Sequence, residues 1–151
     1  MPAPVPYVAV VGAGGEVAAS VLADAEAVGA ELARRGAVVV CGGLGGVMAA
    51  ACRGARAEGG VTLGILPGLD RADASEWVSV AVATGLGELR NGLVVRSVDA
   101  VVAIAGEYGT LSEIALALKA GMRVVALRSW DIRGVLAADD PAAAVALALG
   151  V

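Results

Sequence analysis

Apolar residues are distributed along this chain in two alternating patterns. Short runs rich in valine, bounded by glycine, proline or charged residues, are typical of buried strands. Between these runs, longer stretches rich in alanine and leucine carry apolar residues at helical spacing. The predicted strands are 7–11, 37–40, 61–66, a short 77–82, 100–105 and 123–127, the last strand of the chain. The predicted helices run from the 12–15 turn to about residue 35, from the 42–46 loop to about residue 58, over 89–97, over 110–120, and from 140–141 to near the C-terminus.

Strands that alternate with helices predict an α/β protein. No second zone of composition and no linker interrupts the alternation, so we expect a single domain over residues 1–151. The expected architecture is a doubly wound, Rossmann-like parallel sheet flanked by helices. In such sheets ligands bind at the carboxyl ends of the strands, where the glycine-rich loops of this chain would gather.

The composition is strongly apolar, with 58% hydrophobic and 17% charged residues. Charged residues or clustered glycines break every apolar run before it reaches membrane-spanning length, so we expect no membrane partner. Strands buried on both faces account for part of the excess. The bland helical segments 115–120 and 142–149 need a further packing surface, which favours a homodimer or a higher homo-oligomer.

Charge and missing residue types exclude several function classes. A net charge of −4 with no basic run argues against a nucleic-acid partner. The absence of histidine excludes Ser-His and Cys-His catalysis and every His-based metal site. Cys41 and Cys52 fall on a strand end and the following helix, a poor arrangement for a disulfide, and they lack metal-site partners. We therefore expect no metal site, no required cofactor and, without a signal-peptide pattern at the N-terminus, a cytoplasmic location.

Two glycine-rich loops carry the candidate chemistry, one at 42–46 and one leading into the helix predicted at 110–120. A strand that ends, turns on glycines and begins a helix directs free backbone N–H groups and the positive helix end toward one point. Such a point suits a phosphate. Four glycines among the five residues 42–46 exceed what one tight turn needs, which favours close approach of a ligand over a turn alone.

Other nucleotide motifs are incomplete or absent. The segment 12–17 begins like a dinucleotide-binding fingerprint, but Val17 stands in place of the third glycine and Cys41 in place of the acidic residue. NAD binding is therefore not expected, and the 12–15 loop is left open as a ligand loop or a simple turn. A Walker loop is excluded because no Gly-Lys-Ser/Thr occurs. The only lysine, Lys119, lies late in a predicted helix and is not placed for pyridoxal phosphate chemistry.

Four dispersed segments occur in a characteristic order. They are Cys-Gly-Gly-Leu-Gly-Gly-Val-Met at 41–48, Gly-Ile-Leu-Pro-Gly at 64–68, Thr-Gly-Leu-Gly-Glu-Leu-Arg-Asn at 84–91, and Gly-Thr-Leu-Ser-Glu-Ile-Ala-Leu-Ala-Leu-Lys at 109–119. Together they resemble the LOG-like superfamily of Rossmann-like proteins, long labelled possible lysine decarboxylases. The resemblance is closest to a subgroup that includes molybdenum-cofactor carrier-like proteins, and it covers nearly the whole chain.

The resemblance implies a phosphoribohydrolase site in which Arg90 and Glu113 match the family's catalytic pair. Cleavage of an N-glycosidic bond builds positive charge on the ribose, so a carboxylate at Glu113 would stabilise that charge and activate a water. Arg90 would hold the substrate or orient Glu113 through a charge-assisted hydrogen bond. The implied ligand-binding residues are Gly42, Gly43, Gly45, Gly46, Met48, Asn91, Gly106, Gly109 and Thr110.

Each of these residues also has a purely structural interpretation. Thr110 and Glu113 have the spacing of a helix capping box, with Glu113 in the first turn, which requires no ligand. Taken alone, Arg90 and Asn91 are interpreted first as residues of a solvated helix surface and only second as ligand contacts. Trp77 and Trp130 are expected to pack or to form an interface, although Trp77 lies in a loop region where a base could rest.

One position departs from the family pattern. Glu107 stands where the family has glycine, so a full negative charge lies beside the expected phosphate loop, in a backbone conformation expected to suit glycine. Two functions remain in view. One is hydrolysis of a nucleoside 5′-monophosphate to a free base and ribose 5-phosphate. The alternative is a non-catalytic carrier or binding protein for a phosphorylated pterin (molybdenum cofactor) or a nucleotide, whereas lysine decarboxylation is the least supported.

Overall fold

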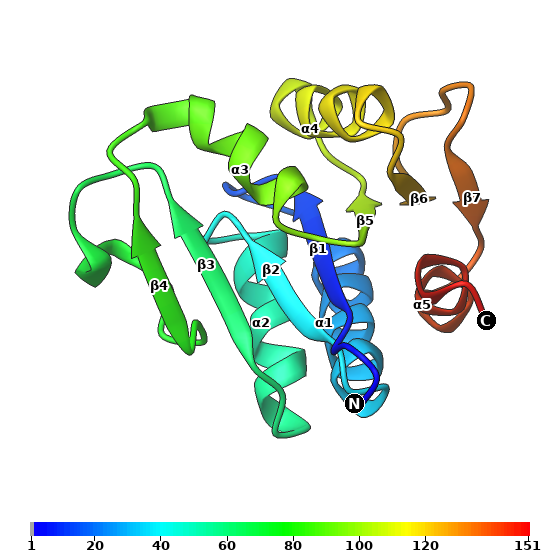
Figure 1. The fold of residues 1–151 in the computed structure, drawn as a ribbon, viewed down its shortest axis with the longest axis horizontal. Coiled ribbons are helices and arrows are strands. Elements are labelled where there is room, and N and C mark those ends of the chain that lie inside the picture. The colour runs from blue at the N-terminus through cyan, green and yellow to red at the C-terminus, as the bar shows by residue number, and fades with distance from the viewer. Residues whose placement is uncertain (1) are drawn as a thin grey trace.

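A computed structural model describes residues 2–151 as one parallel β-sheet covered by helices (Figure 1). The seven strands lie in the order β4-β3-β2-β1-β5-β6-β7, and every neighbouring pair is parallel. The strands are β1 (Tyr7–Gly12), β2 (Val38–Cys41), β3 (Thr62–Leu66), β4 (Val80–Ala83), β5 (Ala100–Ile104), β6 (Arg123–Leu127) and β7 (Leu136–Ala138). The helices are α1 (Ala19–Arg34), α2 (Val47–Ala57), α3 (Asn91–Arg96), α4 (Tyr108–Lys119) and α5 (Pro141–Leu149), with short 3₁₀ turns at Arg71–Asp73 and Gly87–Arg90.

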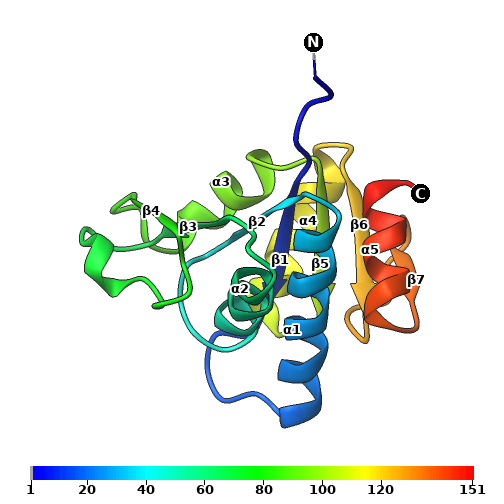
Figure 2. The ribbon, with the colours of Figure 1, turned by 90° about the horizontal axis from the view of Figure 1, so that it is seen from below.

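The helices cover both faces of the sheet, which explains why the central strands are apolar at every position. In β1, Val8 and Val10 pack into a core with α1, α2 and α5, while Ala9 and Val11 pack into a second core with α3 and α4. Figure 2 shows α1 and α2 on one side of the sheet and α3 on the other. This arrangement confirms the predicted doubly wound, Rossmann-like α/β fold.

The strand order reverses at β1, and this reversal positions the candidate site. From β1 the chain proceeds outward through β2, β3 and β4, and then returns to add β5, β6 and β7 on the other side of β1. The connections that follow β1, β2 and β5 therefore meet at one edge of the sheet, above its carboxyl ends. A crevice at such a switch point is the usual ligand position in open α/β sheets.

Several predicted boundaries are wrong. The run 123–127 is not the last strand, because β7 adds a short edge strand whose first two residues are exposed and carry little apolar signal. The segment predicted as one helix at 89–97 is a 3₁₀ turn followed by α3. Helix α4 begins at Tyr108 rather than at residue 110, and α1 begins only at Ala19 after a loop. Among residues 2–151, no helix combines the length and the apolar character needed to cross a membrane.

Candidate functional site

A cavity of about 470 Å³ lies where the loops after β1, β2 and β5 meet. Its walls come from the first loop, the start of α2, the junction of the second 3₁₀ turn with α3, and the beginning of α4. The lining residues are Val10, Val11, Gly12, Ala13, Gly14, Gly15, Glu16, Gly42, Met48, Arg90, Asn91, Glu107, Gly109, Thr110 and Glu113. Segments that are far apart in the sequence thus form one site.

Arg90 is the most unusual side chain of the cavity, because a guanidinium with only 9% exposure is rare. Its Nη2 donates to the carbonyl oxygen of Gly42 over 3.5 Å, and its Nη1 donates to Oδ1 of Asn91. Its Nε is buried and has no acceptor among the described residues. Burial lowers the pKa of Arg90, while the charges of Glu113 and Cys41 act in the opposite direction. A buried donor without an acceptor is costly, and the positive guanidinium, which belongs to a residue that lines the cavity, suits an anionic ligand there.

Gly42 creates the space that Arg90 occupies. A Cβ atom at this position would lie 2.6 Å from Nη2 of Arg90 and 2.8 Å from Sδ of Met48, closer than atoms can approach. The absence of a side chain at the end of β2 therefore lets an arginine from a distant segment reach beneath the loop. Gly42 therefore contributes to the site in two ways: it leaves space for the Arg90 guanidinium, and its carbonyl oxygen accepts a hydrogen bond from that group.

Glu113 lies in the second turn of α4 with 8% exposure, and its side chain forms no hydrogen bond or ion pair with any of residues 2–151. Burial raises its pKa to about 7, although the positive charge of Arg90 acts to lower it. The expected charge-assisted hydrogen bond between Arg90 and Glu113 is therefore not formed. The two groups interact only electrostatically across the cavity, which leaves both available to a ligand.

The predicted capping box at Thr110 and Glu113 is wrong, because α4 begins earlier than its sequence pattern indicates. Its N-cap is Glu107, and no side chain caps the helix. Thr110 is instead the third helical residue, so Glu113 falls beyond the first turn. The structural interpretation that competed with a site role for these two residues is thereby removed.

The first turn of α4 presents free backbone donors to the cavity. The first N–H of this helix to find a backbone acceptor is that of Leu111, which donates to the carbonyl oxygen of Glu107 over 3.0 Å. The N–H groups of Tyr108, Gly109 and Thr110 donate no hydrogen bond within the described part of the chain. These groups and the positive end of the helix dipole favour an anion at this point.

Glu107 does not strain the loop as the sequence suggested. Its φ is −119°, an extended conformation open to any residue, and the left-handed conformations fall on Ala105 and Gly106. Its side chain is exposed at the rim of the cavity, and its carbonyl oxygen accepts a hydrogen bond of 3.3 Å from Nε1 of Trp130. The acidic group therefore lies at the rim of the cavity, beside the proposed anion position.

The structure sorts the predicted site residues into two groups. Those that line the cavity are Gly42, Met48, Arg90, Asn91, Gly109, Thr110 and Glu113, and their role toward a ligand remains a prediction. The other four do not line this cavity, and little room is left for a side chain at their positions. A Cβ atom would meet Leu66 at Gly43, the Gly14 carbonyl oxygen at Gly45, the Ala13 carbonyl oxygen at Gly46 and Thr110 at Gly106.

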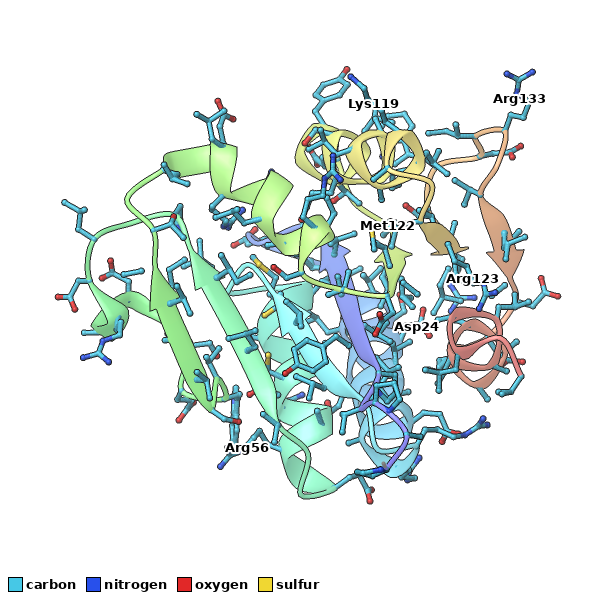
Figure 3. All side chains as sticks on the ribbon, in the orientation of Figure 1. Asp24, Arg56, Lys119, Met122, Arg123 and Arg133 are labelled. Atoms are coloured by element: carbon cyan, nitrogen blue, oxygen red, sulfur yellow. The ribbon has the colours of Figure 1, made fainter. Side chains whose placement is uncertain are left out.

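The loop 12–15, which the sequence allows either as a ligand loop or as a turn, lines the cavity, and so does Glu16, which the sequence did not predict as a site residue. The position of this loop directly after the central strand was the available signal. Cys41 and Cys52 are both free and buried, with their sulfur atoms 3.5 Å apart. Over residues 2–151, no cluster of three or more potential metal ligands is found. Lys119 projects outward from α4 at the helix end remote from the cavity (Figure 3).

The sequence matches one protein-family model and one related protein over most of its length. The model of the SLOG cluster4 family matches residues 5–148. A protein of Archaeoglobus fulgidus with no assigned function is 41% identical over 119 residues, which cover 78% of each chain. These matches agree with the resemblance drawn from the four sequence segments.

Solved structures extend the comparison. The molybdenum cofactor binding protein of the phototrophic bacterium Rippkaea orientalis is 34% identical, with 98% of each chain covered and a TM-score of 0.92. The molybdenum cofactor carrier protein of Chlamydomonas reinhardtii is 33% identical, with 98% of this chain and 100% of that chain covered and a TM-score of 0.87. DNA processing protein A of Streptococcus pneumoniae shares only the fold, at 18% identity and a TM-score of 0.75 over 61% of its own length.

Proposed function

The chain belongs to the SLOG cluster4 family, and we propose that it is a non-catalytic carrier or binding protein for a phosphorylated pterin of the molybdenum-cofactor type. The observation that carries this proposal is the buried Arg90 guanidinium, whose Nε lacks an acceptor among the described residues of the cavity.

The phosphate of the ligand is assigned to the space between Arg90 and the first turn of α4. The guanidinium supplies charge-assisted hydrogen bonds, which are stronger than neutral ones. The free N–H groups of Gly109 and Thr110, two residues that line the cavity, supply directional donors along the positive end of the helix dipole. Because Arg90 is already held by Gly42 and Asn91, little of its side-chain entropy remains to be lost on binding.

The pterin ring is assigned to the remaining polar walls of the same cavity. A pterin edge carries both hydrogen-bond donors and acceptors. Asn91, Thr110 and Glu113 line the cavity and supply both kinds of partner. With a pKa of about 7, Glu113 is an acceptor when ionised and a donor when protonated. The cavity volume of about 470 Å³ lies within the range of small-molecule sites.

The cargo itself is suggested by the similar proteins. The Rippkaea protein is a molybdenum cofactor binding protein, and the Chlamydomonas protein is a molybdenum cofactor carrier protein. Both cover nearly all of this chain at more than 30% identity. This makes binding without chemistry the better supported of the two functions considered from the sequence.

A second candidate function is hydrolysis of a nucleoside 5′-monophosphate, and the observation that favours it is Glu113. A buried carboxyl group with a pKa of about 7 has the property of a general acid or base. Glu113 faces the cavity without a competing partner among the described residues. In this function the carboxylate would stabilise charge on the ribose, and Arg90 would hold the phosphate.

Binding of the phosphorylated pterin to purified protein tests the proposal, measured by calorimetry alongside chromatographic detection of any released base from AMP. Arg90→Met is expected to weaken pterin binding at least about tenfold, because the charged hydrogen bonds are lost. Arg96→Met is the matched control, since Arg96 is an exposed arginine at the end of α3. Pterin binding without base release supports the carrier. Base release that Glu113→Gln abolishes would establish the hydrolase instead.

A further inference from the structure

A second and larger cavity, of about 670 Å³, lies on the other side of the loop that follows β1. It is bounded by this loop, by the start of α1, by α2 and by the β3–β4 connection that carries Trp77. Gly15 and Glu16 line both cavities, so a single short loop separates them. A ligand that crosses this loop would occupy both.

The two cavities differ in chemistry. The first is lined by Arg90, Asn91, Thr110 and Glu113, whereas Val17, Leu22, Ala49 and Ala50 give the second a mainly apolar wall. Its volume follows from the small residues on α2, because Ala49 and Ala50 leave unfilled the space that larger side chains would occupy. An apolar cavity of this size suits a ring system rather than a second phosphate.

Two further side chains of the second cavity, Trp77 and Arg53, indicate which kind of ring system would bind there. Trp77 is 37% exposed and its indole Nε1 forms no hydrogen bond within residues 2–151, so no hydrogen bond of the indole competes with a planar ring stacked on it. Stacking of a base on an aromatic side chain tightens binding by about tenfold or more. Arg53, paired with Glu26, lies on the same wall and adds a cation beside the ring.

Glu16 stands between the two cavities and has an exposed side chain. A carboxylate in this position can accept hydrogen bonds from the hydroxyl groups of a ligand that crosses the loop. A sugar between the phosphate and the second ring system supplies such hydroxyl groups. A sugar with a planar base is a nucleoside.

We infer that the protein takes a pterin dinucleotide, with the phosphorylated pterin beside Arg90 and the nucleoside in the cavity between Trp77 and Ala49. This inference rests on the proposed function, since it assigns the pterin half to the site described above. It adds the ligand class: a pterin joined through phosphates to a nucleoside, in preference to the pterin monophosphate alone.

Calorimetric titration with the pterin monophosphate and the pterin dinucleotide tests the inference. The wild-type protein is expected to bind the dinucleotide about tenfold more tightly, as one stacked base allows. Ala49→Phe fills the second cavity from the half-buried first turn of α2 and is expected to abolish this difference without changing the monophosphate affinity. Ala57→Phe places the same ring at the exposed far end of α2 and is expected to change neither affinity.

Trp77→Ala is expected to lower only the dinucleotide affinity, and Trp77→Phe to restore most of it. The retained monophosphate affinity shows in each variant that the fold is intact. Equal affinities of the wild type for both ligands would overturn the inference and leave the proposed function standing. If neither ligand binds, both fall. In one further outcome, Ala49→Phe changes the mass measured by sedimentation and leaves both affinities unaltered. This result would mean that a second copy of the chain covers the cavity, and it would also overturn the inference.

Discussion

The loop after β2 and the segment that leads from β5 into α4 both contain glycine, and they have different tasks. In the loop Gly42 to Gly46, added Cβ atoms would collide with Arg90, Leu66 or the backbone of the first loop. At the start of α4, a Cβ on Gly109 would meet nothing within 4 Å, and the nearby N–H groups have no acceptor among the described residues. The loop after β2 is therefore packed closely against protein atoms (the closed loop), whereas the first turn of α4 leaves its N–H groups open toward the cavity (the open region). Glycine content alone does not distinguish these two cases.

The largest expected effect is that of Gly46→Ala, in the closed loop. The residue has a φ of +63°, and the new Cβ would lie 2.2 Å from the carbonyl oxygen of Ala13. Strain and collision together are expected to lower the free energy of unfolding by about 4 kcal/mol. Urea denaturation followed by circular dichroism measures this loss. A loss below about 1 kcal/mol would show that the loop after β2 is not held by packing against the loop after β1, and the two regions would then not differ in this respect.

The next effect concerns Glu113 in the open region. Its pKa of about 7 lies above the usual 4.5, so the folded protein holds a proton that the unfolded chain releases. The contribution of this raised pKa to the free energy of unfolding is fully present below pH 4.5. It is lost as the pH rises through 7, and the total loss is about 3 kcal/mol. Glu113→Gln is expected to remove this slope and to exceed the wild type in stability at pH 8. Parallel pH profiles of the two proteins would contradict the burial of the carboxyl group.

Gly42→Ala tests how the closed loop serves the open one. The added Cβ meets the flexible ends of Arg90 and Met48, which can move, so the expected cost in stability is only about 1–2 kcal/mol. Ligand affinity is expected to fall about as far as in Arg90→Met, because the guanidinium is displaced. Calorimetry compares the two variants. An unchanged affinity would mean that Arg90 binds without the support of Gly42.

The smallest effect is expected for Gly109→Ala. The position is helical and open, so alanine is expected to raise stability by about 0.5–1 kcal/mol through its higher helix propensity. The backbone N–H is retained, so anion binding is expected to persist. The same denaturation and calorimetry experiments apply. A destabilised protein would show that Gly109 is held by contacts like those of the loop after β2.

Much of the fold was predictable from local patterns, since valine runs bounded by breakers mark buried parallel strands whatever surrounds them. β7 was not predicted, because a three-residue edge strand buries few side chains and is too short to show a periodic pattern of apolar residues. The capping pattern at Thr110 misled because the start of α4 depends on the turn at Ala105 and Gly106, which a consensus for isolated helix ends does not contain. Arg90 and Glu113 were found by motif, whereas the wall formed by the loop after β1 was left undecided.

By itself, the sequence determined that this protein is a doubly wound α/β sheet of the LOG-like superfamily with phosphate-type loops at its strand ends. Hydrophobic periodicity, helix-breaking and strand-breaking residues and the order of motifs can be read directly from the chain. None of them requires knowing which residues are in contact. Three features of the site become visible only in the folded protein: Arg90 reaches beneath Gly42, Gly46 packs on the loop after β1, and Glu113 is buried without a partner among residues 2–151. These properties depend on distances between segments dozens of residues apart, and burial and pKa depend on what surrounds a group in space.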